Sequence, residues 1–272
     1  MAKEYKIKEG EKFLVNDHDP EDESWWDGDK SSAEKELKNL RKKLITLQHL
    51  LWAEDKHKLL IVLQAMDAGG KDGTIRAIFK GVNPQGVKVA SFKVPSSIEL
   101  AHDYLWRIHQ KTPARGEIVI FNRSHYEDVL VVRVKNLVPK KTWEKRYHHI
   151  VEFEKMLADE GTTILKFFLN ISKDEQKERF MERINDKRKQ WKFNPEDIEA
   201  RESWNDYMKA FEEALTKTST EYAPWYVIPA NHNWYRDLVV SKIIVGCLED
   251  LKMKYPAPIE NIDSYKEVLK KS

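Results

Sequence analysis

Leucine recurs at intervals of three and four residues near the start of the chain, within an otherwise polar segment. The leucines of this stripe are Leu37, Leu40, Leu44, Leu47 and Leu51. This spacing places them on one face of an α-helix, and Ser31 with Glu34 matches a capping box just before them. The pattern predicts a long amphipathic helix that runs from Ser31 to about residue 55.

Five short apolar segments alternate with helical patterns along the rest of the chain. They are Leu59–Leu63, Val87–Phe92, Glu117–Phe121, Thr163–Ile171 and Trp225–Ile228. Apolar runs of this kind, separated by helices, are typical of the strands of a parallel sheet that helices cover on both faces. We therefore expect an α/β fold.

The two ends of the chain differ from this central region. Residues 1–30 are polar and acidic but contain Trp25 and Trp26, so we interpret them as an extended arm whose tryptophans dock on the body. Residues 31–255 are expected to form one domain, with a lid at about 175–200. Residues 256–272 are interpreted as a C-terminal tail.

The overall composition excludes several classes of protein. Lys and Arg number 47 against 45 Asp and Glu, a net charge of +2, which argues against bulk binding of nucleic acid or another polyanion. No apolar run approaches the roughly 20 residues that span a bilayer, and the first residues lack the apolar core of a secretory signal. The single cysteine, Cys247, cannot form an internal disulfide. We expect a cytoplasmic protein with no membrane contact.

A glycine-rich turn follows the first predicted strand. The segment AMDAGGKDGT approximates the phosphate-binding loop GxxxxGK[ST], but Ala65 and Asp72 depart from that pattern. Glycines at the start of a helix let backbone N–H groups face phosphate oxygens, and Lys71 adds a positive charge. The phosphate contacts expected from this segment are Gly69, Gly70, Asp72, Gly73 and Thr74.

Asp67 is an unusual residue in an anion site, because its carboxylate repels phosphate unless a divalent cation lies between them. We therefore assign Asp67 to Mg²⁺, with Mn²⁺ as the alternative metal. The competing interpretation is that the Gly-Gly turn merely connects a strand to a helix.

A second polar cluster, NRSHYED, follows the third predicted strand. The carboxyl ends of parallel strands form the edge at which α/β proteins bind ligands. Asp128 is the first candidate for a second magnesium ligand, and Glu127 is the second. Arg123 can clamp a phosphate, and Asn122 can contact substrate. A capped helix start with a surface ion pair would also explain this cluster.

Basic residues are concentrated between Lys177 and Lys192, a segment that contains seven basic and three acidic residues. Arg179 and Arg183 are four residues apart and share a helix face, and Lys187 continues the stripe at the next turn. A solvated helix face explains most runs of this kind. This run, however, follows the last long strand, where nucleotide kinases carry an arginine-bearing lid over the phosphates.

Four segments extend this interpretation: MDAGGKDGTI, FNRSHYEDV, KQWKFNPEDIEARESWNDY and APWYVIPANHNWYRD. In this order and spacing they resemble the family-2 polyphosphate kinases, which transfer phosphate between inorganic polyphosphate and nucleotides. The resemblance covers roughly residues 30–255. It implies a thymidylate-kinase-like P-loop fold with a helical lid, magnesium dependence and homo-oligomers. The second segment resembles the subgroup that accepts both AMP and ADP.

The resemblance also implies a set of site residues and a reaction. The residues are Asp67, Lys71, Asn122, Arg123, Glu127, Asp128, Arg179 and Arg183. The expected reaction is in-line transfer of the terminal phosphate of polyphosphate to ADP or AMP, giving ATP or ADP, with guanine nucleotides as further candidate acceptors. Catalysis would come from positioning and charge neutralisation, without a covalent enzyme intermediate. Lys187 would bind the donor chain farther from the transfer point.

Two other functions compete with this one. An ATP-dependent nucleotide or nucleoside kinase could share the fold, but Ala65 and Asp72 alter the usual ATP loop. A non-catalytic binder of polyphosphate or nucleic acid could use the basic stripe, although it would gain nothing from two carboxylates at the phosphate site. The leucine stripe and the two tryptophans favour an interface, so at least a dimer, or a tetramer, is expected.

Overall fold

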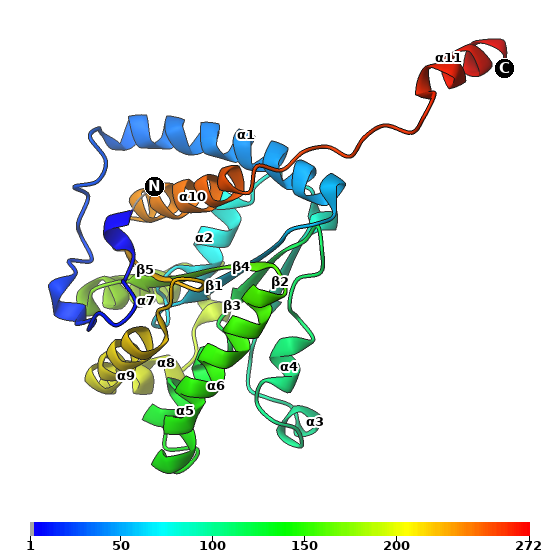
Figure 1. Ribbon diagram of the computed structural model, residues 1–272. Coiled ribbons are helices and arrows are strands. Elements are labelled where there is room, and N and C mark those ends of the chain that lie inside the picture. The colour runs from blue at the N-terminus through cyan, green and yellow to red at the C-terminus, as the bar shows by residue number, and fades with distance from the viewer. Residues whose placement is uncertain (1–2) are drawn as a thin grey trace.

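The computed structural model describes residues 3–272 and contains one parallel five-stranded sheet (Figure 1). Its strand order is β2-β3-β1-β4-β5. The strands are β1 (Lys58–Gln64), β2 (Val87–Ser91), β3 (Ile118–Asn122), β4 (Thr162–Asn170) and β5 (Trp225–Pro229). Each begins and ends within one residue of its predicted position, so the expected parallel sheet is confirmed.

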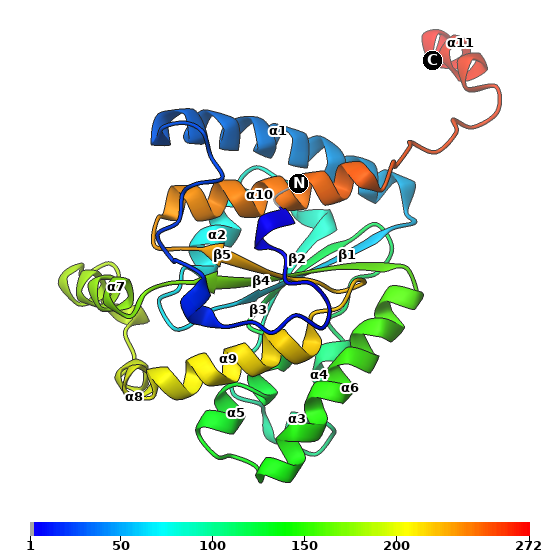
Figure 2. The ribbon, with the colours of Figure 1, turned by 60° about the vertical axis from the view of Figure 1, so that its left-hand side comes forward.

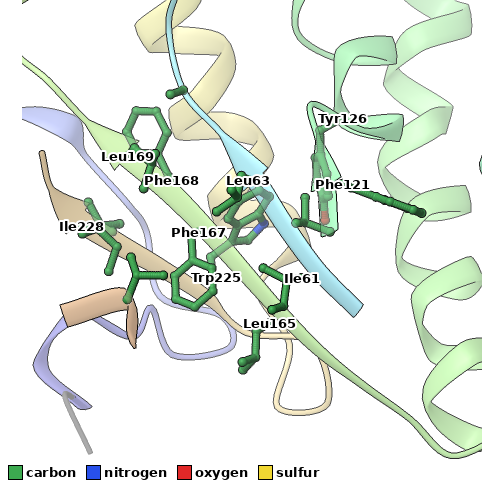
Figure 3. Packing of buried hydrophobic residues seen from close by; sticks show 14 of the residues in the cluster. Ile61, Leu63, Phe121, Tyr126, Leu165, Phe167, Phe168, Leu169, Trp225 and Ile228 are labelled. Atoms are coloured by element: carbon green, nitrogen blue, oxygen red, sulfur yellow. The ribbon is translucent and has the colours of Figure 1, made fainter. Parts of the chain in front are cut away.

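The central strand β1 lies between β3 and β4, with Leu60 paired to Val119 on one side and to Ile164 on the other. Every residue of β1 after Lys58 is buried, as expected for a strand with helices over both faces. Figure 3 shows the buried side chains of this region, among them Phe167 and Trp225.

Helices cover the sheet on two sides (Figure 2). One layer contains α1 (Lys30–Glu54), α2 (Lys71–Ile78) and α10 (Asn233–Asp250), and the other contains α6 (Lys140–Asp159) and α9 (Trp204–Thr218). Since all strands run in parallel, the helices that follow them start at the same edge of the sheet. That edge carries the glycine-rich turn and the end of β3.

The predicted helix at the leucine stripe is α1, and four of its five leucines are buried, with Leu47 half-buried. The predicted capping box is wrong. The helix begins one residue earlier, and Asp29 caps it by accepting a hydrogen bond from the Ser32 backbone N–H at 2.8 Å. An aspartate at this position is as good a cap as serine.

Shorter elements connect this framework. The helices are α3 (Ser97–Leu100), α4 (Trp106–His109), α5 (Val131–Val134), α7 (Lys173–Asn185), α8 (Glu196–Glu202) and α11 (Ile262–Lys271). The 3-10 turns are η1 (Lys3–Tyr5), η2 (Val15–Asp17), η3 (Pro84–Gly86), η4 (His125–Asp128) and η5 (Gln190–Lys192). The segment from α7 to α8 occupies the place in the chain at which we expect a helical lid. Within residues 3–272, no helix combines the length and the apolar character needed to cross a membrane.

The N-terminal arm docks on the body, as the two tryptophans predicted. The backbone N–H of Ile7 donates to the carbonyl of Trp225 at 2.9 Å, which joins the arm to the edge strand β5. Phe13 is buried, and Trp25 and Trp26 are half-buried against the core. The C-terminal helix α11 instead projects away from the body, and all its residues are exposed (Figure 1).

Candidate active site

The turn between β1 and α2 has a backbone that only small residues fit. Gly70 has a φ of 96°, and a Cβ atom there would lie 2.1 Å from Nη1 of Arg236. A Cβ on Gly69 would lie 2.5 Å from the Cβ of Ala65, so the two residues pack closely across the turn. The first N–H groups of α2 follow directly and provide the dipole end that favours phosphate.

Lys71 is buried at this turn. Its Nζ donates to the carbonyl oxygen of Ala65 at 2.9 Å and lies 3.4 Å from that of Met66. Burial, followed by the positive charge of Arg123, lowers the pKa of Lys71 to about 8, although nearby Asp67 acts in the opposite direction. The ammonium is therefore held inside the turn by backbone carbonyls.

Thr74, Asp72 and Gly73 have different surroundings. The hydroxyl of Thr74 donates to the carbonyl of Gly70 at 3.1 Å, inside α2. Asp72 is exposed and accepts hydrogen bonds from Asn122 at 2.7 Å and from Lys192 at 3.3 Å, so it joins the end of β3 to the lid. Gly73 lies beside Arg236, to which an added Cβ would approach within 3.5 Å.

The end of β3 brings Arg123 to Asp67. Arg123 has a left-handed backbone, with φ of 61°, and its Nη2 donates to Oδ1 of Asp67 at 2.5 Å. Burial opposes the charge on this guanidinium, but the carboxylates of Glu127 and Asp67 raise the pKa of Arg123 above its usual value. The structure thus unites two residues that are 56 positions apart in the sequence.

Glu127 and Asp128 point into different environments. Glu127 lines the same pocket as Asp67 and Arg123, and with the Gln64 amide turned to its better-bonded orientation, Gln64 donates to Oε1 of Glu127 at 3.0 Å. Burial raises the pKa of Glu127, while Arg123 and then Lys71 lower it. Glu127 is therefore the second carboxylate of the pocket.

Asp128, our first sequence candidate for a metal ligand, does not line that pocket. Its Oδ1 accepts from Nη1 of Arg146 at 2.8 Å, and both side chains are largely buried. Burial raises the pKa of Asp128 to about 6 despite the charge of Arg146. Of the two carboxylates, Glu127 and not Asp128 lines the pocket with Asp67, whereas the sequence placed Asp128 first.

The lid helix α7 is attached to the glycine-rich turn through backbone carbonyls. Gln176 donates to the carbonyl of Asp67 at 2.9 Å, and Arg179 donates to that of Ala68 at 3.1 Å. The other Nη of Arg179 donates to the carbonyls of Ala230 at 2.6 Å and Asn231 at 3.0 Å. Arg179 thus joins three segments of the chain at the edge of the site.

Arg183 and Lys187 do not continue this arrangement as one stripe. Arg183 pairs with Asp197 of α8, whose Oδ2 lies 3.3 Å from its Nη1. The helix ends at Asn185 and Asp186 is extended, so Lys187 lies beyond α7 and is exposed. The prediction that Lys187 shares the helix face of Arg179 and Arg183 is wrong, because α7 ends at Asn185, before Lys187.

The pocket itself lies between the end of β3, the lid and α9. Its charged lining residues are Asp67, Arg123, Glu127, Lys135, Glu196 and Asp197. Its apolar lining includes Leu130, Val131, Ala200, Tyr207 and Phe211. The lining therefore combines charged side chains, which suit phosphate, with apolar side chains, which suit a flat or apolar group.

Two site residues were missing from the sequence prediction. Asp197 enters the pocket from the lid, and burial, then the charge of Asp67, raises its pKa. Arg236 is 2% exposed and packs against Gly70, with Nη1 donating to Asn233 at 2.6 Å and Nη2 donating to Asp237 at 2.7 Å. A basic residue in the first turn of a helix that follows a strand is a signal that would have found Arg236.

The donor set suits a magnesium ion. Among residues 3–272, no three His, Cys, Asp or Glu side chains converge on one point. Mg²⁺ usually takes only one or two protein carboxylates and completes its shell with water and substrate phosphates. Asp67 and Glu127, beside the phosphate turn, fit that requirement.

Comparisons with known proteins show which family this chain resembles over its length. The family model described as Polyphosphate kinase 2 (PPK2) matches residues 27–256. An AMP/ADP-polyphosphate phosphotransferase from Meiothermus ruber is 61% identical over 256 residues, which cover 94% of this chain and 96% of that protein. An ADP-polyphosphate phosphotransferase from Rhodopseudomonas palustris is 44% identical, with coverage of 94% and 92%.

A solved structure supports the same relationship. The crystal structure of Polyphosphate Kinase 2 from Arthrobacter aurescens TC1 aligns with 100% of this chain and 96% of that chain, with a TM-score of 0.95 and 39% identity. The likeness therefore extends over the whole fold, including the lid. By its sequence and its structure, the chain belongs to the polyphosphate kinase 2 family.

Proposed function

We propose that this chain transfers the terminal phosphate of inorganic polyphosphate to AMP and to ADP, and so makes ADP and ATP. The observation that carries the proposal is the pocket of Asp67, Arg123 and Glu127 directly beside the buried Lys71 turn. The names of the Meiothermus ruber and Rhodopseudomonas palustris relatives support this donor and these acceptors.

The two substrates would occupy different parts of the site. The glycine-rich turn and the start of α2 suit the phosphates of the donor, since backbone N–H groups and Lys71 meet there. The pocket suits the acceptor nucleotide, with its phosphate near Arg123 and its nucleoside against Val131, Tyr207 and Phe211. The transferred phosphate would then pass between the turn and Arg123.

The chemistry would depend on positioning and charge neutralisation. Arg123 would orient the acceptor oxygen, and Lys71 would offset charge on the transferring phosphate. Asp67 and Glu127 would hold Mg²⁺, which supplies positive charge to phosphate oxygens when bound. Arg183, held by Asp197, would close the lid side of the pocket. No covalent enzyme intermediate is needed for in-line transfer.

The test is an assay of the purified chain with magnesium and long-chain polyphosphate, offering AMP, ADP, GMP and GDP separately and no ATP. We expect ATP from both AMP and ADP. Parallel reactions with ATP in place of polyphosphate identify an ATP-dependent kinase, and reactions with a chelator test the metal requirement. Phosphorylation of AMP by ATP but not by polyphosphate would contradict the proposal.

A further inference from the structure

A fully buried polar network lies beneath η4. Lys166 of β4 and Glu154 of α6 form an ion pair at 2.5 Å, and neither side chain is exposed. The hydroxyl of Tyr126 lies 2.8 Å from Nζ of Lys166 and 2.9 Å from Oε1 of Glu154. Figure 3 shows Tyr126 beside Phe121, inside the core.

The network extends to two more elements. Nζ of Lys166 donates to the carbonyl of Thr218 at 2.7 Å, and the Thr218 hydroxyl lies 2.9 Å from the hydroxyl of Tyr126. The indole N–H of Trp225 donates to the same Thr218 hydroxyl at 2.9 Å. On the other side, Nε2 of His125 lies 3.2 Å from Oε1 of Glu154. Residues of η4, α6, β4, α9 and β5 therefore meet at one point.

Stability alone does not account for such a network. Removing a lysine and a glutamate from water costs several kcal/mol for each ion, and replacing a buried pair by apolar residues of similar size is often neutral or stabilising. The polar groups instead constrain geometry, because each hydrogen bond fixes the position and angle of the partner side chain. Their effect falls on η4, which contributes His125 and Tyr126 to the network.

The held residues lie next to the site. Tyr126 directly precedes Glu127, and His125 follows Ser124, whose neighbour Arg123 has the left-handed backbone that turns it toward Asp67. The hydroxyl of Ser124 is itself buried and accepts from the backbone N–H of Tyr126 at 3.2 Å. We infer that fixing the side chain of Tyr126 restrains the backbone on both sides of it, toward Arg123 and toward Glu127.

We propose that the network of Tyr126, Glu154 and Lys166 positions Arg123 and Glu127 for phosphoryl transfer. These three are positioning residues, because none of them lines the pocket. The inference rests on the roles proposed above for Arg123 and Glu127. It predicts that the network sets the rate of the reaction more than the binding of polyphosphate at the glycine-rich turn.

The first test is Tyr126→Phe, which keeps the ring and removes only the hydroxyl. We expect kcat with AMP to fall by about tenfold or more, because displacement of reacting groups by about 1 Å can cost a factor of 10². KM for long-chain polyphosphate should change by less than about twofold, because the substitution leaves the expected polyphosphate contacts at the glycine-rich turn untouched. The increase in melting temperature on addition of AMP should become smaller, since a misplaced Arg123 binds the acceptor phosphate less well.

Matched controls separate positioning from general loss of stability. Ile244→Val and Leu44→Ala remove core atoms in α10 and α1, on the other layer of helices. They should lower the melting temperature by amounts that bracket the effect of Tyr126→Phe while leaving kcat unchanged well below that temperature. A second variant, Glu154→Leu with Lys166→Met, removes both charges together and so leaves neither of them buried and unpaired, and it should still lose kcat.

The outcomes are distinguishable from failure of the proposed function. If the unmodified chain makes no ADP from AMP and polyphosphate, the proposed function fails. If it does so and Tyr126→Phe keeps kcat and the AMP-induced shift unchanged, the proposed function stands and the positioning inference is overturned. The inference would also be overturned if Tyr126→Phe and the two control variants showed the same loss of kcat for a given fall in melting temperature.

Discussion

Glu127 and Asp128 are adjacent carboxylates with different surroundings. Glu127 lines the pocket with Asp67, whereas Asp128 accepts from Arg146 of α6, whose guanidinium also lies over the ring of Tyr104. A carboxylate that shares a metal ion with substrate must reach the substrate phosphates. We therefore propose Glu127 as the carboxylate that takes part in the chemistry, whereas Asp128 attaches η4 to α6.

The raised pKa of Asp128 gives this assignment a measurable consequence. Its pKa is about 6 in the folded chain against a usual value of 3.8, because burial outweighs the charge of Arg146. Between these values the folded chain binds more protons at Asp128 than the unfolded chain, so its contribution to the free energy of unfolding falls as pH rises. The Asp128→Asn variant does not titrate at this position.

The free energy of unfolding of the unmodified chain, minus that of Asp128→Asn, should therefore decrease between about pH 4 and pH 6, by up to about 3 kcal/mol. Urea unfolding of both proteins across this range measures the difference, in which the other carboxylates cancel. A difference that stays constant with pH would mean that Asp128 is not a buried acid in the folded chain.

At the scale of elements, the lid has one part anchored to backbone carbonyls and another part held to the site by ion pairs. Helix α7 is bound to the glycine-rich turn because the side chains of Gln176 and Arg179 donate hydrogen bonds to backbone carbonyls of that turn. Beyond Asn185, the contacts to the site include the ion pairs of Lys192 with Asp72, of Arg183 with Asp197 and of Glu196 with Lys135. Substrates that compete for these charges would loosen the second part while α7 stays in place.

This division predicts that substitutions at two basic residues of the lid change the free energy of unfolding by different amounts. Arg179→Lys cannot reproduce a guanidinium that donates to three backbone carbonyls and to Glu175, so it should lower the free energy of unfolding by about 1–3 kcal/mol. Lys187→Ala, at an exposed position, should stay within about 0.5 kcal/mol. Denaturant unfolding measures both, and equal effects would contradict the division.

The elements were more predictable than the side chains of the site. Buried strands such as Leu59–Leu63 have apolar runs with few alternatives, and the leucine stripe defines α1 by its spacing. The choice between Glu127 and Asp128 depends on the direction of a single 3-10 turn, which no periodicity encodes. The fate of Lys187 depended on where α7 ends, and boundaries are weakly encoded because caps of several types are equivalent.

At the scale of the whole molecule, the two ends of the chain behave differently. The N-terminal arm adds to the core, with the Tyr5 and Tyr235 hydroxyls 2.5 Å apart and buried. The leucine stripe of α1 is also covered by the chain's own core, so it is not free to form an interface. Helix α11 instead leaves Ile262, Tyr265, Val268 and Leu269 exposed, each between 46% and 74%.

We therefore still expect at least a dimer, now because of the apolar face of α11 and no longer because of the leucine stripe. Exposed apolar surface of this kind tends to be covered by association. Light scattering at micromolar concentration should report at least twice the chain mass of 32.1 kDa. A mass equal to that of a single chain would contradict this expectation.

The central claim is that polyphosphate phosphorylates AMP at a site built from Asp67, Arg123 and Glu127. It is tested most directly by the initial rate of ADP and ATP formation from AMP and long-chain polyphosphate, without added ATP, for the unmodified chain, Glu127→Gln and Asp128→Asn. The account predicts turnover by the unmodified chain, a loss of about 10²-fold or more in Glu127→Gln, and substantial activity in folded Asp128→Asn. No turnover by the unmodified chain, or loss in Asp128→Asn with Glu127→Gln unaffected, would contradict it.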